Sequence, residues 1–125
     1  MLRRTILPVL AATAWIGFSE FARNQLLLKP YWIAHYQKLG LVFPDKPVNA
    51  AVWGVWSLLF ALAVYAISRK FTLLETTLLS WYLGFMVMWV VIGNLGILPF
   101  GILKFGIPLS LLEAFLAAYI VKRAA

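Results

Sequence analysis

The sequence predicts an all-α integral membrane protein, and three observations support that prediction. The chain has 125 residues, of which 64% are hydrophobic and only 12% charged, whereas soluble domains average roughly 25% charged residues. Its mean hydropathy is +0.92. The apolar residues also fall into four runs, each near the length of about 20 residues that crosses a bilayer core. We therefore expect one domain, residues 1–125, that forms a single four-helix transmembrane bundle.

The four expected helices are separated by polar or breaker-rich segments, and cover approximately residues 5–28, 50–68, 72–93 and 98–121. The first run has a basic start and an Ala-Thr-Ala stretch, which is also typical of a cleaved signal peptide. We expect it to remain as a helix. Asn49 is the expected N-cap of the second helix. Pro99 and Pro108 should interrupt the fourth, because proline lacks the backbone donor.

The long connection between the first two helices predicts a short interfacial helix at approximately residues 31–39. Pro30 ends the preceding run, aromatic residues then recur at helical spacing, and Gly40 is a plausible C-terminal cap. Aromatic rings concentrate at membrane–water interfaces. The expected interfacial side chains are Tyr31, Trp32, His35 and Tyr36. His35 is favoured as an interfacial side chain over a ligand or a proton carrier.

Basic residues favour one orientation in the membrane. Three pairs fall on the same side of the predicted bundle: Arg3-Arg4, Arg69-Lys70 and Lys122-Arg123. By the positive-inside rule, both termini are expected in the cytoplasm, in a multi-pass protein of the cell (inner or plasma) membrane. The opposite side also carries several lysines, so the bias is modest and inverted or dual insertion stays open.

Composition excludes several classes of function. The chain has no cysteine and a single histidine, so disulfides, thiolate metal sites and Fe–S clusters are excluded, and no metal or cofactor is expected. No phosphate-binding loop or nucleophile motif is present, and an enzyme is the least favoured class. The net charge of +7 matches topology and contact with anionic lipid headgroups. Membrane lipids are therefore the expected partners, and nucleic acid is not.

Each run carries a stripe of small or polar residues at helical spacing, and such stripes mark the faces where membrane helices meet. The tryptophans are expected mostly on flanking faces or at the interfaces. The stripes are Thr13, Gly17, Glu20 and Asn24; Ala50, Gly54, Ser57 and Ala61; Thr77, Ser80 and Gly84; and Gly106, Ser110, Glu113 and Ala117.

One polar cluster lies at the outer end of the first helix. Glu20, Arg23 and Asn24 stand at i, i+3 and i+4, so the carboxylate can pair with both neighbours on one helical surface. Such pairing avoids an ionised group left alone in hydrocarbon. The cluster is either a structural clamp, which we favour, or a substrate or ion site. Asn94, at the outer end of the third helix, is a candidate further partner.

Glu113 is the other membrane carboxylate, one helical turn after Ser110. No basic residue lies within its reach along the helix, and intramembrane acids are functional-site hypotheses by default. Glu113 is a candidate proton or solute site, and equally a contact for a partner subunit. From the helical rise, its depth differs from that of Glu20 by about 10 Å, too far for the two acids to share one small reacting centre.

Two functions follow from this pattern. The first is a homo-oligomeric transporter or channel for protons or a cationic or amphipathic solute, with binding candidates Glu113, Glu20, Arg23, Asn24, Asn94 and Ser110. The alternative is a non-catalytic accessory or assembly subunit of a larger membrane complex. Polar residues in membrane helices face away from lipid whether they line a pore or contact a partner chain. Both hypotheses therefore stay open, with transport slightly favoured.

Overall fold

A computed structural model describes residues 2–124, and it is all-helical over that range. Four helices have the length and apolar composition needed to cross a membrane, with mean hydropathies between 1.4 and 2.0. These helices indicate a multi-pass membrane protein, and the all-α fold class is confirmed. They span Arg3–Leu27, Pro47–Ser68, Leu73–Asn94 and Phe100–Arg123.

Three of the four spanning helices change helical type along their length. In chain order the elements are α1 (Leu2–Phe21), η1 (Ala22–Leu27), α2 (Lys29–Lys38), α3 (Pro47–Ser68), α4 (Leu73–Trp81), η2 (Tyr82–Met86), α5 (Val87–Asn94), η3 (Phe100–Ile102) and α6 (Leu103–Ala124). Both η1 and η2 are π-helical. A π turn holds one residue more than an α turn and often marks a functional site.

The helix ends follow local side-chain chemistry. Thr72 caps α4, and its capping box is completed by Glu75, whose carboxylate accepts from the Thr72 N–H. Lys46, not Asn49, is the N-cap of α3; Asn49 lies at the third helical position, and its side chain accepts from the Lys46 N–H. The N-cap prediction for Asn49 is wrong because Pro47 supplies a preset first helical residue ahead of it.

Prolines and glycines set the remaining boundaries. Pro30 lies in the first turn of α2, which begins at Lys29, and Gly40 follows α2 with a positive φ of 72°. Pro99 precedes the fourth spanning helix in an extended conformation, so only Pro108 lies inside it. Gly96, with φ 77°, turns the chain after α5. A positive φ is a conformation that glycine adopts without steric cost.

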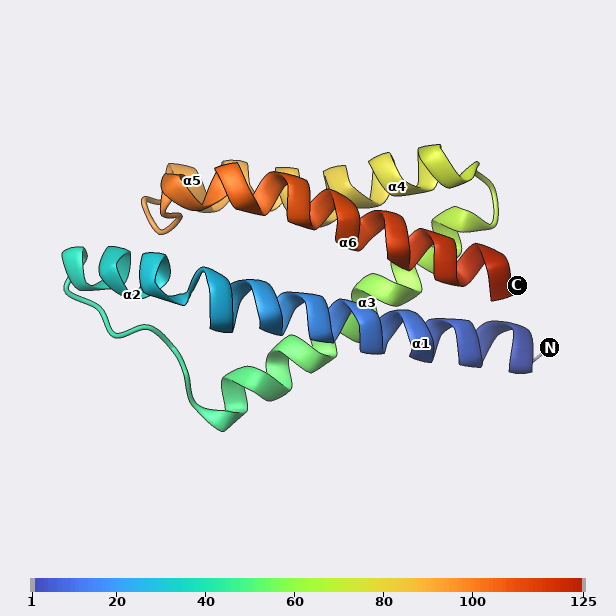
Figure 1. Cartoon of the computed structure of the whole chain (residues 1–125), viewed down its shortest axis with the longest axis horizontal. Coiled ribbons are helices and arrows are strands. Elements are labelled where there is room, and N and C mark those ends of the chain that lie inside the picture. The colour runs from blue at the N-terminus through green and yellow to red at the C-terminus, as the bar shows by residue number, and fades with distance from the viewer. Residues whose placement is uncertain (1, 125) are drawn as a thin grey trace.

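The helices form an elongated bundle from which α3 diverges (Figure 1). Helix α6 packs against α1, α3 and α4. Helix α3 crosses the others obliquely, so its first half points away from α5 while its second half lies in the bundle. Both termini lie at one end, called here the terminal end. Helix α2 and the following connection, residues 39–46, lie at the other, called here the connection end.

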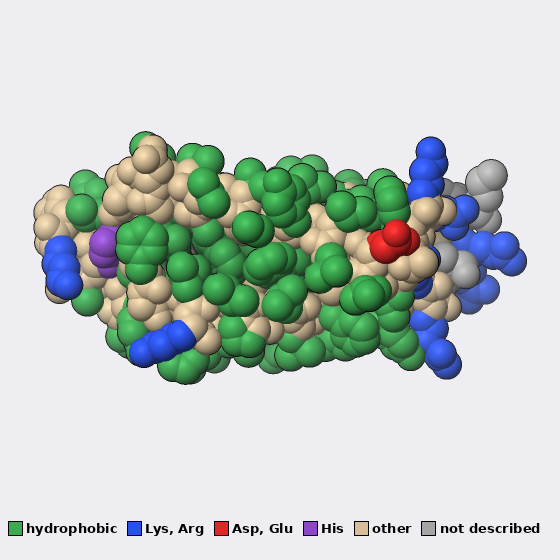
Figure 2. Space-filling view, turned by 90° about the horizontal axis from the view of Figure 1, so that it is seen from above, with side chains coloured by type: hydrophobic (Ala, Val, Ile, Leu, Met, Phe, Trp, Pro, Cys, Tyr) green, Lys and Arg blue, Asp and Glu red, His purple; other side chains and the backbone are tan. Residues whose placement is uncertain are grey.

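Charge is distributed unevenly along the bundle. Lysine and arginine side chains gather at the terminal end, and the middle of the surface is mostly hydrophobic (Figure 2). At that end Lys122 donates to the carbonyl of Ser68, 2.9 Å away, which ties the end of α6 to the end of α3. A hydrophobic middle surface between two polar ends is the pattern expected where the middle of the protein contacts lipid.

The main core lies where the helices converge. It consists of Val9, Ala12, Ile16, Phe60, Ala61, Val64, Phe85, Ala117, Ala118 and Val121. Many of these are small, which lets the helices approach closely. The predicted stripe of α3 is buried at Ser57 and Ala61, whereas Ala50 and Gly54 are exposed, because that half of α3 leaves the bundle. Cavities therefore lie beside the first half of α3.

Candidate functional site

The polar cluster predicted at the end of the first helix forms at the start of η1. Arg23 Nη2 lies 2.7 Å from Glu20 Oε1, and Asn24 Nδ2 donates to Glu20 Oε2 over 2.9 Å. Only 4% of Glu20 and 7% of Arg23 is exposed. The two charges are thus removed from both water and lipid, and each is satisfied by the other.

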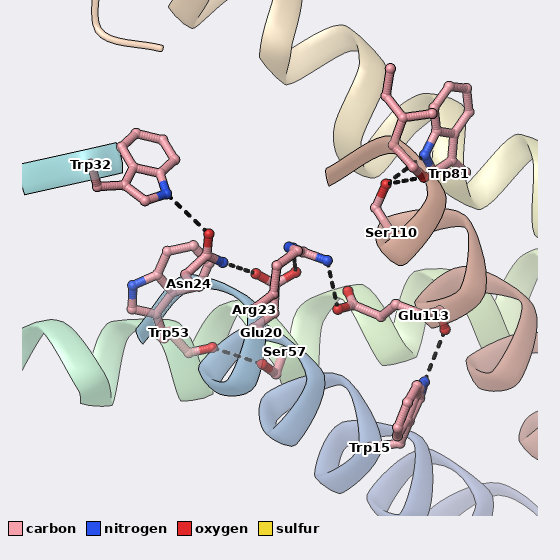
Figure 3. A network of polar contacts seen from close by, with 11 residues as sticks. Trp15, Glu20, Arg23, Asn24, Trp32, Trp53, Ser57, Trp81, Ser110 and Glu113 are labelled. Carbon is pink, nitrogen blue, oxygen red and sulfur yellow. Dashed lines mark hydrogen bonds and ion pairs between the residues drawn. The ribbon is translucent and has the colours of Figure 1, made fainter. Parts of the chain in front are cut away.

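Glu113 joins this cluster from α6. Its Oε1 accepts from Arg23 Nη1 at 3.3 Å, and the two carboxylates approach the guanidinium from different sides (Figure 3). The expectation that Glu113 stands without a cation in the chain is therefore wrong. The depth difference inferred from the helical rise concerns the backbone, and the Arg23 side chain is long enough to contact both acids. One arginine joins the two acids.

The helices at this level are held together by further bonds. Trp15 Nε1 donates to the Glu113 carbonyl oxygen at 3.0 Å, which links α1 to α6. Trp81 Nε1 donates to Ser110 Oγ at 2.9 Å, which links α4 to α6 (Figure 3). These bonds fix Glu113 and Ser110 on the α6 face that looks into the bundle. Ser110 itself is occupied by Trp81, one turn away from the acid.

Both π-helical segments lie at the Arg23 cluster. Arg23 belongs to η1, whose last turn is closed by a 2.7 Å bond from the Leu28 N–H to the Arg23 carbonyl. Its guanidinium carbon lies 5.3 Å from the ring centroid of Phe85, a buried residue of η2. A cation over an aromatic face is stabilised by the ring quadrupole. Two irregular turns thus meet across one cation–π contact.

The cluster has more acid than base. It contains two carboxylates and one guanidinium, and Glu113 Oε2 has no hydrogen-bond partner among residues 2–124. With both acids ionised, the cluster carries a net charge of −1 in a desolvated position. Burying an uncompensated ion costs several kcal/mol even after relaxation. A proton or a bound cation would remove that cost.

A cavity of about 410 Å³ lies between this cluster and the connection end. Glu20, Arg23 and Asn24 line it on one side, and it extends to Tyr36 and Phe43 beneath the connection. Seven of its twenty lining residues are aromatic. The aromatic residues from the spanning helices are Trp53, Trp56, Phe85 and Trp89. An apolar cavity of this size with a few convergent polar groups is typical of a small-molecule site. We call it the aromatic pocket.

A second cavity, of about 430 Å³, lies between α1 and the first half of α3. It is more polar, and its lining includes Asp45 and Lys46, which do not line the aromatic pocket. Glu20 and Trp53 line both cavities. The Asp45 carboxylate is 2.6 Å from Lys29 Nζ, an ion pair that ties the connection to the start of α2. Glu20 is therefore bordered by an aromatic space on one side and a polar one on the other.

The remaining predicted residues lie as follows. Trp32 reaches the cluster, because its Nε1 donates to Asn24 Oδ1 at 3.2 Å. Both Trp32 and Tyr36 line the aromatic pocket. Tyr31 and His35 lie outside it; the His35 ring nitrogen is 2.7 Å from the Gly96 carbonyl oxygen. Asn94 is exposed and is not brought to the cluster.

The tryptophans are the site residues that the sequence did not single out. Trp53, Trp56 and Trp89 line the aromatic pocket, and Trp15 and Trp81 bond to α6. None of the five therefore serves only on a flanking face. The sequence contains a weak signal for the pocket-lining position of two of them. Trp53 and Trp56 are three residues apart and share a helical face with the stripe residue Ser57.

Comparisons with known proteins leave the site to be interpreted from its own geometry. No family model matches the chain, and neither the curated proteins nor the solved structures contain a match. Within residues 2–124, no group of three or more His, Asp or Glu side chains is placed to hold a metal ion. The arrangement is chemically suited to exchange protons and to bind a cation.

Proposed function

We propose that this protein is a membrane transporter that exchanges a proton for a cationic, amphipathic solute. The supporting observation is the surplus carboxylate of the Glu20–Arg23–Glu113 cluster beside the aromatic pocket. A proton on one acid neutralises the surplus charge, and a bound cation neutralises it equally well. Because each removes the electrostatic benefit of the other, the two ligands compete, and such competition is the basis of exchange.

The walls of the aromatic pocket favour a cation with apolar substituents. Indole faces attract cations, with a contribution of about 0.5–2 kcal/mol per contact that is largest away from water. Tryptophan is the most effective of the aromatic side chains in this respect, and four tryptophans line the pocket: Trp32, Trp53, Trp56 and Trp89. Glu20 supplies a negative charge at one side of the pocket. The pocket can therefore bind both the charged group and the apolar substituents of an amphipathic cation.

The accessory-subunit alternative used the small-residue stripes and Glu113 as docking contacts. Glu113 has 0% exposure and pairs with Arg23 of its own chain, so it does not present a surface to a second protein. We therefore favour transport. Homo-oligomerisation, location in the cell membrane and cytoplasmic termini remain part of the proposal, supported by the exposed apolar helix faces and by the basic terminal end (Figure 2).

The test uses purified protein in liposomes that contain a pH-sensitive dye. Benzyltrimethylammonium, a poorly permeant aromatic cation, is added outside, and exchange should make the lumen more alkaline as protons leave. Glu113→Gln should abolish the change, since the surplus charge is gone. Glu75→Gln is the matched control, because Glu75 is an exposed capping residue far along the chain from the cluster. A wild-type protein without exchange, or a Glu113→Gln variant that retains it, contradicts the proposal.

A further inference from the structure

A lipid-facing groove adjoins the aromatic pocket. It has a volume of about 330 Å³ and lies between the middle of α3 and the region where α4 passes into η2. Leu59 and Leu83, which are 58% and 60% exposed, form part of its walls. Side chains so apolar and so exposed in the middle of a spanning helix face the hydrocarbon of the membrane. The groove is thus open to lipid.

Two residues join the groove to the pocket. Trp56 of α3 and Met88 of α5 line both cavities. These two side chains therefore lie where the groove and the aromatic pocket adjoin. The Trp56 ring is stacked on Phe60 at 5.0 Å, and a Cβ added to Gly84 would lie 2.5 Å from the Phe60 ring. Close packing at Gly84 marks where α3 and η2 meet.

The groove also contains an unsatisfied polar group. Ser80 is 1% exposed, lines the groove, and its Oγ has no hydrogen-bond partner among the described residues. A buried hydroxyl without a partner costs free energy. Because this hydroxyl is buried, the surface that the groove presents to a ligand is apolar, as an alkyl tail requires.

We infer that the solute is a single-chain cationic amphipath that enters from the membrane through the gap between Trp56 and Met88. Its cationic head lies in the aromatic pocket near Glu20, and its tail lies in the groove. The groove residues run from Trp56 to Ile67 on α3, a span of about 16 Å at the helical rise. That length matches an extended tail and exceeds what a compact cation needs. The inference rests on the proposed function and names its substrate class.

Photolabelling in phosphatidylcholine nanodiscs tests the inference without requiring transport. The probe is a long-chain alkyltrimethylammonium with a diazirine at the end of its tail, and labelled residues are mapped by mass spectrometry. Labelling should concentrate on the groove, including Leu59 and Leu83. Leu83→Trp fills the groove and should reduce this labelling severalfold. Val90→Trp should not, because Val90 is a 67% exposed residue outside both cavities.

Binding of benzyltrimethylammonium verifies that the variants are folded. It should be unchanged in Leu83→Trp, because Leu83 does not line the aromatic pocket. Labelling spread evenly over the lipid-facing surface, or undiminished in Leu83→Trp, overturns the inference. So does groove labelling by a photoreactive phosphatidylcholine that the cationic probe fails to displace. Groove labelling that persists while proton exchange is absent would instead support the ligand site and reject the proposed transport.

Discussion

Arg23 is the residue on which the polar cluster depends. It pairs with Glu20 at 2.7 Å and with Glu113 at 3.3 Å, and it lies over the ring of Phe85. The Glu113 carboxylate is tied to the first spanning helix through this guanidinium, while the Glu113 backbone carbonyl accepts from Trp15. Arg23 and Glu113 differ in this respect, because loss of Glu113 leaves a balanced Glu20–Arg23 pair, whereas loss of Arg23 leaves two buried carboxylates.

This difference gives a prediction for stability. Arg23→Gln should lower the free energy of unfolding by about 3–5 kcal/mol, the range for removing one partner of a buried ion pair. Glu113→Gln should cost much less, since the remaining charges balance. Thermal unfolding of the two variants in one detergent measures the difference. Equal destabilisation by both variants would show that the surplus carboxylate is not a strained, uncompensated charge.

At the scale of the elements, the irregular turns η1 and η2 bring the cluster together. η1 holds Arg23, and η2 holds both Phe85 and Gly84. Phe60 of α3 packs over Gly84, where a methyl group has no room. The contact sets the point from which α3 diverges, and so it determines the width of the aromatic pocket.

Gly84→Ala should therefore destabilise the protein by about 1–3 kcal/mol, the usual cost of overpacking. The added Cβ would lie 2.5 Å from the Phe60 ring, so the ring must move. Gly54→Ala is the control, because nothing lies within 4 Å of a Cβ there and alanine favours a helix. Chemical unfolding of both variants measures the costs. The double variant Gly84→Ala, Phe60→Leu should recover stability; if it does not, the ring contact is not the cause.

The elements also indicate how far sequence reasoning extends. Four apolar runs suffice to predict the spanning helices, because length and hydropathy are local properties. The pairing of Glu20, Arg23 and Asn24 is local too, being fixed by helical spacing. The bond from Arg23 to Glu113 depends on how α1 and α6 pack, which no single run encodes. The π turns and the aromatic pocket depend on the same packing and on the divergence of α3.

At the scale of the whole molecule, the two ends differ in charge and in structure. Both termini lie at the basic end, and α2 and the connection cover the other (Figures 1 and 2). The aromatic pocket lies toward the connection end. If the basic end faces the cytoplasm, as the positive-inside rule predicts, the polar cavity beside Glu20 faces the opposite side.

The orientation can be measured directly because the chain has no cysteine. Single cysteines introduced at Lys46, in the connection, and at Lys70, in the turn before α4, are treated with a membrane-impermeant maleimide in intact cells. Lys46→Cys should be labelled from outside and Lys70→Cys only after the membrane is opened. The reverse pattern indicates inverted insertion, and partial labelling at both sites indicates dual insertion.

In the proposed exchange, a proton and a cation compete for the surplus carboxylate. Proton release on ligand binding measures this competition most directly: benzyltrimethylammonium is titrated into purified protein in weakly buffered detergent solution over a series of pH values. At its maximum, close to one proton should be released for each cation bound, and none from Glu113→Gln. Cation binding that releases no proton at any pH, or equal release from Glu113→Gln, would contradict it.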